Sequence, residues 1–142
     1  MHVFTYGSLM FPEIWEIVVG REFETIEGTV SGYSVYRVRR GTYPGMIATA
    51  SENSVTGLVY LDVDRESIAR LDRFEGRFYE RRMLQVICAD GQQRAADAYV
   101  VPGRNGLGLT SETWTAEGFV AGGGIVNFTR RFQGFSRLEV EG

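Results

Sequence analysis

The stretch YERRMLQVICADGQQRAADAYVV, residues 79–101, decides the fold of this chain. It contains two strand-like apolar runs, residues 79–89 and 94–101, joined by Asp90-Gly91. An Asp-Gly pair between two such runs is the turn chemistry of a tight β-hairpin, because Gly and Asp tolerate the positive φ that the turn needs. We therefore predict an antiparallel hairpin, with Cys88 as an inert thiol in its core.

A helix is predicted directly before this hairpin. Asp64 suits its N-cap and Gly76 its C-terminal stop. Between them, apolar side chains recur every three residues, at Ile68, Leu71 and Phe74. This spacing places one apolar face against a core.

Glu75 is the most unusual residue of that helix, since it stands at the C-terminal end, where the helix dipole disfavours an anion. Its neighbours Phe74 and Phe78 are apolar, and burial beside them would raise the pKa of its carboxyl group toward neutrality. Such an acid can accept and return a proton. The alternative is an exposed carboxylate neutralised by Arg73 or Arg77, and the pattern alone leaves both interpretations open.

The N-terminal segment predicts a strand, a tight turn and a helix, in that order. Residues 3–6 are strand-like and end at Gly7, and Pro12 suits the first turn of a helix. Residues 28–38 form a long β-rich stretch in which Gly32 marks a bulge or a sharp bend.

Further strands are expected at residues 46–50 and 55–61, and the turn at residues 51–54 predicts a meander or hairpin. Near the end, Gly122-Gly-Gly124 forbids a continuous helix, and a terminal helix is expected at residues 125–132. Several strands, two or three helices and short turns indicate an α+β fold in which antiparallel pairing dominates.

Composition restricts the possible functions. A chain of 142 residues with 44% hydrophobic content suits a single domain, residues 1–142. All 15 basic residues are arginines, which excludes Schiff-base and phosphate-loop lysine chemistry. The net charge of −3 with dispersed bases argues against nucleic-acid binding.

No apolar run approaches the roughly 20 residues of a membrane span, so we expect a soluble, cytoplasmic protein without membrane contact. His2 is the only histidine and Cys88 the only cysteine, which leaves no cluster for a metal site. We expect no cofactor, and either a monomer or a homodimer. Acid and base chemistry then falls to carboxylates and tyrosines.

Three short motifs can contribute to a binding site. In Tyr6-Gly7-Ser8-Leu9, the glycine permits a sharp turn that aims successive backbone amides at one anionic group, although the same letters also describe an ordinary turn. Tyr43-Pro44-Gly45 offers a rigid turn, a hydroxyl group and room for a ligand, or a simple β-turn. Tyr79 and Arg81 alternate along a strand and can frame a polar pocket together, or be a core tyrosine and a surface arginine.

Taken in this order, the motifs resemble the gamma-glutamyl cyclotransferase-like family, specifically its small bacterial and gamma-glutamylamine cyclotransferase-type branch. The resemblance covers about residues 3 to 101 and rests on five segments: Val3-Phe-Thr-Tyr-Gly-Ser-Leu9, Tyr43-Pro-Gly45, Gly57-Leu-Val-Tyr60, Leu71-Asp-Arg-Phe-Glu-Gly76 and Tyr79-Glu-Arg81. It implies a small mixed, mainly antiparallel β-barrel with flanking helices and a cavity at one end.

The resemblance also implies a reaction. The backbone amides of the loop at Tyr6 to Leu9 would bind the α-carboxylate of a gamma-glutamyl group, and Glu75 would be the general base and acid. The substrate α-amine would attack its own gamma-carbonyl and release 5-oxoproline with an amine or amino acid, without a metal or cofactor. The expected substrate-binding residues are Tyr6, Gly7, Ser8, Leu9, Tyr43, Pro44, Gly45, Tyr79 and Arg81.

Two other functions remain compatible with the sequence. The same amide loop could bind an amino-acid-like metabolite without catalysis, in which case replacing Glu75 would not affect binding. Alternatively, the tail Arg130-Arg131-Phe-Gln-Gly-Phe135 could dock a protein partner or a second copy of the chain.

Overall fold

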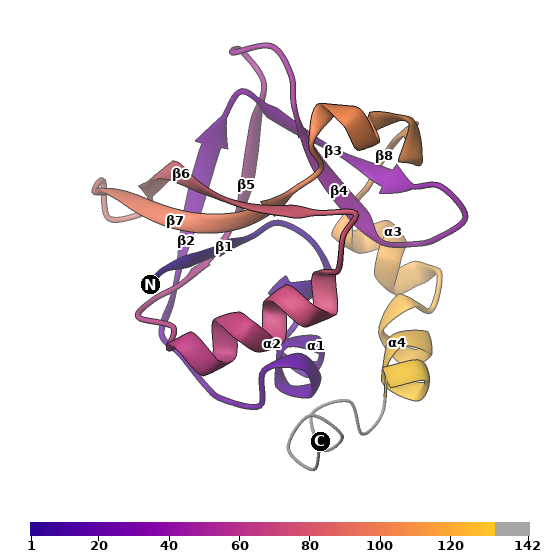
Figure 1. The fold of residues 1–142 in the computed structure, drawn as a ribbon, viewed down its shortest axis with the longest axis horizontal. Coiled ribbons are helices and arrows are strands. Elements are labelled where there is room, and N and C mark those ends of the chain that lie inside the picture. Colours follow the sequence, from indigo (N-terminus) through magenta and orange to yellow (C-terminus); the bar gives the residue numbers. More distant parts are fainter. Residues whose placement is uncertain (133–142) are drawn as a thin grey trace.

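A computed structural model describes residues 1–132 (Figure 1). The strands are β1 Val3–Thr5, β2 Thr25–Ser31, β3 Tyr33–Val38, β4 Pro44–Ala48, β5 Ser54–Tyr60, β6 Glu80–Cys88, β7 Gln93–Val100 and β8 Leu109–Thr113. The helices are α1 Pro12–Val18, α2 Arg65–Glu75, α3 Ala116–Ala121 and α4 Gly124–Phe132, with 3₁₀ turns η1 Ser8–Met10 and η2 Gly103–Gly108. The part of the predicted docking tail from Gln133 to Phe135 lies outside the described residues.

The predicted hairpin is confirmed as β6 and β7. These strands pair antiparallel from Glu80↔Val100 to Ile87↔Gln93. At the turn, Gly91 has a φ of +84°, which only glycine adopts without strain. Cys88 lies at the end of β6 and is buried and unbridged, as expected for a core thiol.

A barrel closes around this hairpin. The order β1-β5-β2-β6-β7 returns to its start because β1 also pairs with β7, in parallel at Val3↔Asp97. Beyond β7 the sheet continues through β4, β3 and β8, joined by a parallel contact at Met46↔Val100. The expected small, mixed and mainly antiparallel barrel with flanking helices is therefore confirmed (Figure 1).

The long β-rich stretch around Gly32 divides into two strands. Gly32 has a φ of +84° and separates β2 from β3, so the predicted sharp bend is present. Before the bend, β2 pairs with β5 inside the barrel; after it, β3 pairs with β4 outside it. This bend thus leads the chain from the closed barrel into the strands β3, β4 and β8 that extend the sheet beside it.

Two predictions about the following segment are wrong. The turn at residues 51–54 does not join a hairpin, because β4 pairs with β3 and β7 whereas β5 pairs with β1 and β2. Pro44 and Gly45 do not form a β-turn; they begin β4, opposite Arg37 and Tyr36. A proline is tolerated as the first residue of a strand, and a sequence cannot show that its neighbour continues one.

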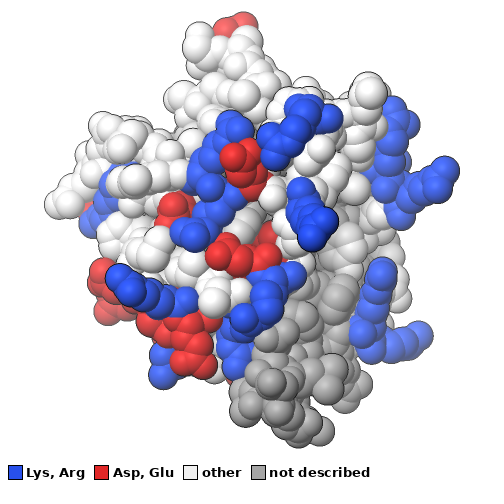
Figure 2. All heavy atoms as spheres, in the orientation of Figure 1, with Lys and Arg blue, Asp and Glu red and all other residues white. Residues whose placement is uncertain are grey.

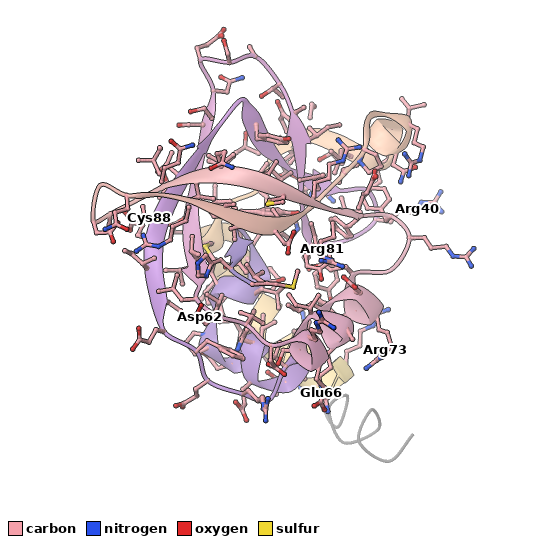
Figure 3. All side chains as sticks on the ribbon, turned by 60° about the vertical axis from the view of Figure 1, so that its left-hand side comes forward. Arg40, Asp62, Glu66, Arg73, Arg81 and Cys88 are labelled. Carbon is pink, nitrogen blue, oxygen red and sulfur yellow. The ribbon has the colours of Figure 1, made fainter. Side chains whose placement is uncertain are left out.

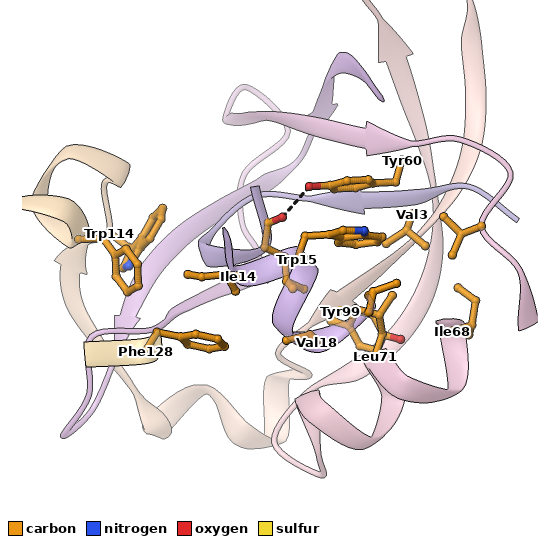
Figure 4. Close-up of a cluster of buried hydrophobic side chains, with 14 residues drawn as sticks. Val3, Ile14, Trp15, Val18, Tyr60, Ile68, Leu71, Tyr99, Trp114 and Phe128 are labelled. Atoms are coloured by element: carbon orange, nitrogen blue, oxygen red, sulfur yellow. Dashed lines mark hydrogen bonds between the residues drawn. The ribbon is translucent and has the colours of Figure 1, made fainter. Parts of the chain in front are cut away.

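Neighbouring residues of β1 belong to two different apolar clusters, because successive side chains of a strand point to opposite faces of the sheet. Phe4 packs inside the barrel with residues such as Val59 and Val86. Val3 belongs to a second cluster between the barrel and the helices (Figure 4). There the rings of Trp15 and Tyr60 stack with their centroids 3.6 Å apart and their planes 4° apart.

Helices α1, α2 and α4 are confirmed close to their predicted bounds, whereas α3 was not predicted. Helix α2 starts after Asp64, buries Ile68 and Leu71, and ends at Gly76, whose φ is +71°. The glycine triplet separates α3 from α4, and α4 covers the expected terminal helix. No helix within residues 1–132 is long and apolar enough to cross a membrane.

Candidate active site

The first wall of the candidate site is the turn that follows β1. Gly7 lies against Pro44, and a Cβ atom added to Gly7 would stand 2.1 Å from the Pro44 Cγ atom. No other residue fits without moving that proline, so the close contact between the two segments explains the glycine. The backbone then enters η1 at Ser8.

This turn leaves two backbone amides available. The amides of Met10 and Phe11 donate to the carbonyl oxygens of Gly7 (3.0 Å) and Ser8 (3.1 Å). In the described part of the chain, no acceptor is bonded to the amides of Ser8 and Leu9. Both residues line a cavity, so these two donors are suited to an anionic ligand group there.

The opposite wall is the C-terminal end of α2, where Glu75 lines the same cavity. Burial raises the pKa of Glu75 from 4.5 to about 8. Among residues 1–132 no ion pair involves Glu75, so the interpretation as an exposed carboxylate neutralised by Arg73 or Arg77 is not supported. A carboxyl group that titrates near neutral pH can act as base and then as acid.

Aromatic packing fixes the backbone on both sides of Glu75. The rings of Phe74 and Phe128 meet edge to face, with centroids 5.7 Å apart. Phe78 packs edge to face on Tyr79 at 5.2 Å, and its carbonyl oxygen accepts a hydrogen bond from Asn105 Nδ2 at 2.9 Å. The apolar surroundings that the sequence suggested for Glu75 are therefore present.

The cavity between these walls has a volume of about 260 Å³. It is bordered by β1, the turn after it, the start of β4, the end of α2 and Tyr99 of β7. Its lining residues are Phe4, Thr5, Tyr6, Gly7, Ser8, Leu9, Val38, Tyr43, Pro44, Phe74, Glu75, Phe78, Tyr79 and Tyr99.

Tyrosine hydroxyl groups tie the cavity walls together. Tyr6 donates to the carbonyl oxygen of Tyr99 (2.7 Å), and Tyr79 donates to that of Pro44 (2.6 Å). Burial, with a contribution from the charge of Glu75, raises the pKa of both Tyr6 and Tyr79 well above the ordinary value. Both therefore stay neutral while Glu75 titrates.

Two of the residues expected in the site lie outside the cavity. Gly45 faces the opposite side of β4, where an added Cβ would be 2.6 Å from Leu109 and 2.8 Å from Val101. Arg81 instead pairs with Asp72 at 3.0 Å and with Asp97 at 3.5 Å. On the face of the molecule that Figure 2 shows, acidic groups lie among arginines in this way. Arg81 stands opposite Tyr99 in the β6–β7 register but is not among the residues that line the cavity.

Six of the lining residues were not predicted as site residues: Phe4, Thr5, Val38, Phe74, Phe78 and Tyr99. For Phe74 and Phe78 a signal existed, since they flank Glu75. For Tyr99 the signal was weak, because its place beside the cavity depends on barrel closure. Within residues 1–132 there is no group of three or more His, Cys, Asp or Glu that could hold a metal ion.

Comparisons with known proteins agree with this architecture. The family described as "Gamma-glutamyl cyclotransferase, AIG2-like" matches residues 3–116. AIG2-like protein A of Arabidopsis thaliana is 28% identical over 95 residues, which are 67% of this chain and 57% of that protein. The chain spans little more than half the length of the curated relatives it matches first.

Solved structures show the same fold. A solution structure of an Arabidopsis thaliana protein has a TM-score of 0.70 at 23% identity and covers 97% of this chain and 91% of its own. A structure named "Gamma-glutamyl cyclotransferase" has a TM-score of 0.63 at 15% identity, with 71% and 66% covered. These structures share the barrel fold of this chain, and the family match over residues 3–116 shows that the chain belongs to the gamma-glutamyl cyclotransferase, AIG2-like family.

Proposed function

We propose that this chain is a gamma-glutamyl cyclotransferase that converts a gamma-glutamyl compound into 5-oxoproline and a free amine or amino acid. The observation that carries the proposal is the position of Glu75, whose pKa is raised to about 8, in the same cavity as the unbonded amides of Ser8 and Leu9. Membership of the family supports the same reaction class.

The amides bind the substrate α-carboxylate, which places the neighbouring α-amine inside the cavity. Glu75 removes a proton from this amine, and the nitrogen attacks the gamma-carbonyl carbon of the same molecule. A carbon–nitrogen bond forms in the five-membered lactam, and the bond to the leaving nitrogen breaks. Glu75 then returns its proton to the leaving nitrogen, so the reaction needs no external acid, base or redox partner.

The chemistry suits a site of this size because attack within one molecule needs little besides a folded substrate and one proton carrier. Holding the two reacting groups together removes much of the entropic barrier. A positioned acid or base contributes about 10² to 10⁴ in rate. Among the described residues that line the cavity, Glu75 alone carries a carboxyl group, so this contribution is assigned to it.

The test is the release of 5-oxoproline from a panel of gamma-glutamylamines and gamma-glutamyl-amino acids. We expect turnover by the wild-type chain and a loss of about 10² to 10⁴ in kcat for Glu75→Gln, which keeps the volume but cannot carry the proton. Glu66→Gln is the matched control, because Glu66 lies in the first turn of the same helix and is exposed (Figure 3).

Undiminished activity of Glu75→Gln would contradict the assigned role. Calorimetric binding of 5-oxoproline without turnover, unchanged in Glu75→Gln, would instead favour a non-catalytic metabolite-binding domain that uses the same amides.

A further inference from the structure

A polar network attaches the last turn of α2 to the barrel. Asp72, three residues before Glu75, accepts two hydrogen bonds on Oδ1: from the Tyr99 hydroxyl at 2.6 Å and from Arg81 Nε at 3.0 Å. Arg81 also reaches Asp97 on β7 at 3.5 Å. Figure 3 shows Arg81 between the β6–β7 hairpin and α2.

The hydrogen bond from Tyr99 to Asp72 connects this network to the cavity. Tyr99 is 5% exposed, lines the cavity, and accepts the hydroxyl hydrogen of Tyr6 on its backbone oxygen. Its own hydroxyl donates to a charged acceptor, which is a stronger bond than one between neutral groups. The Arg81–Asp72 ion pair is partly exposed and contributes less.

Glu75 requires such an attachment. Residues three apart in a helix share one face, so Asp72 and Glu75 move together. Ionised Glu75 is disfavoured both by burial and by the helix C-terminus. If the last turn were free, the carboxylate would turn toward water, and the base would be lost from the cavity.

We propose that Asp72 is a positioning residue: by joining Tyr99 and Arg81 to the last turn of α2, it holds the Glu75 carboxyl group in the cavity. The inference rests on the proposed function for its effect on catalysis, but its effect on Glu75 is separate. Among the described residues, the titratable side chains that line the cavity with Glu75 are Tyr6 after β1, Tyr43 before β4, Tyr79 before β6 and Tyr99 on β7, and burial raises the pKa of all four, which keeps them neutral near pH 8.

The test is a carbon-13 NMR titration of the Glu75 carboxyl group, identified by its absence in Glu75→Gln. We expect its pKa to fall by about one unit in Asp72→Asn and in Tyr99→Phe, because a loosened turn exposes the carboxylate to water. Tyr99→Phe is the sharper variant: it removes no charge and makes the cavity less polar, so without loosening the pKa would stay or rise.

Asp64→Asn is the matched control, since it removes a carboxylate from the other end of α2 and should leave the Glu75 pKa unchanged. A Glu75 pKa that is unchanged or raised in Tyr99→Phe would overturn the inference, and a fall in Asp72→Asn alone would be a charge effect. In turnover we expect kcat of Asp72→Asn to fall about tenfold with KM within about twofold.

The two proposals fail separately. If the wild-type chain releases no 5-oxoproline while the NMR shifts appear, the proposed function fails and the positioning role stands. If the wild-type chain turns over but Tyr99→Phe leaves the Glu75 pKa and the kcat unchanged, the positioning role fails alone.

Discussion

The two ends of α2 carry carboxyl groups in opposite electrostatic situations. At the N-terminal end, Asp64 accepts a hydrogen bond from the Ser67 hydroxyl at 2.5 Å and pairs with Arg21 at 3.0 Å. The bond from Ser67 is the largest of the effects that lower the pKa of Asp64. At the C-terminal end, burial raises the pKa of Glu75 to about 8.

A single helix thus carries a structural acid, Asp64, at one end and a candidate catalytic acid, Glu75, at the other. Both carboxyl groups are within one residue of a helix end, but the dipole favours an anion only at the first end. Asp64 lies beside a hydrogen-bond donor, Ser67, and a cation, Arg21, whereas Glu75 lies among mainly apolar side chains of the cavity. The sequence pattern indicates which end of the helix each carboxyl group occupies. Its burial determines its pKa, and therefore whether it can carry a proton near neutral pH.

The largest expected effect concerns the pH dependence of catalysis. Glu75 must be ionised to remove the substrate proton, so we expect kcat/KM to fall about tenfold for each pH unit below about 8. Initial rates between pH 5.5 and 9 measure this. The residual activity of Glu75→Gln provides the control, since its profile reflects only the substrate amine; a wild-type rate that is flat between pH 6 and 8 would contradict the assignment.

A smaller effect is expected in stability. The pKa of Glu75 is about 8 in the fold against 4.5 ordinarily, so between these values the folded chain binds a proton that the unfolded chain has released. Stability conferred by this group therefore falls as pH rises from about 4.5 to about 8. Because the Glu75 side chain is half-buried rather than fully buried, we expect Glu75→Gln to exceed wild type in unfolding free energy by only about 2 kcal/mol at pH 9.

Urea unfolding at pH 9 and pH 4 measures this difference, which should be close to zero at the lower pH. An equal gain at both values would mean that Glu75 is destabilising for a reason other than its charge.

Much of the fold could be predicted because its signals are local. Asp90-Gly91 fixes a hairpin through turn chemistry, and the three-residue spacing of Ile68 and Leu71 fixes a helix through periodicity. The pairing of β4 could not be predicted in this way. It pairs with β3, which precedes it in the chain, and in parallel with the distant β7, and neither pairing belongs to the ring that closes the barrel, whereas the nearby turn at residues 51–54 suggested β5.

The residues of the candidate site also differ in whether a local sequence signal could predict them. Glu75 could be found because a carboxylate at a helix C-terminus departs from the ordinary chemistry of that position. The turn at Gly7 was placed in the site chiefly through the family resemblance, since the same letters also describe an ordinary turn. The family resemblance placed Gly45 and Arg81 in the pocket, but a Cβ atom added to Gly45 would meet Leu109 and Val101, and Arg81 pairs with Asp72. The bond between Asp72 and Tyr99 joins residues 27 apart and has no local signal.

The smallest expected effect is at the other end of α2 and has the opposite sign in pH. The folded pKa of Asp64 is lowered, so its contribution to stability is present above its ordinary value of 3.8 and is lost as pH falls through the folded value. Asp64→Asn keeps an oxygen for Ser67 but loses the charge that faces Arg21 and the helix dipole. We expect a cost of about 0.5 kcal/mol at pH 7 that disappears in strong acid, as urea unfolding at pH 7 and pH 2 would measure. A loss that persisted at pH 2 would show that the asparagine disturbs packing rather than charge, and the contrast between the two helix ends would then not be electrostatic.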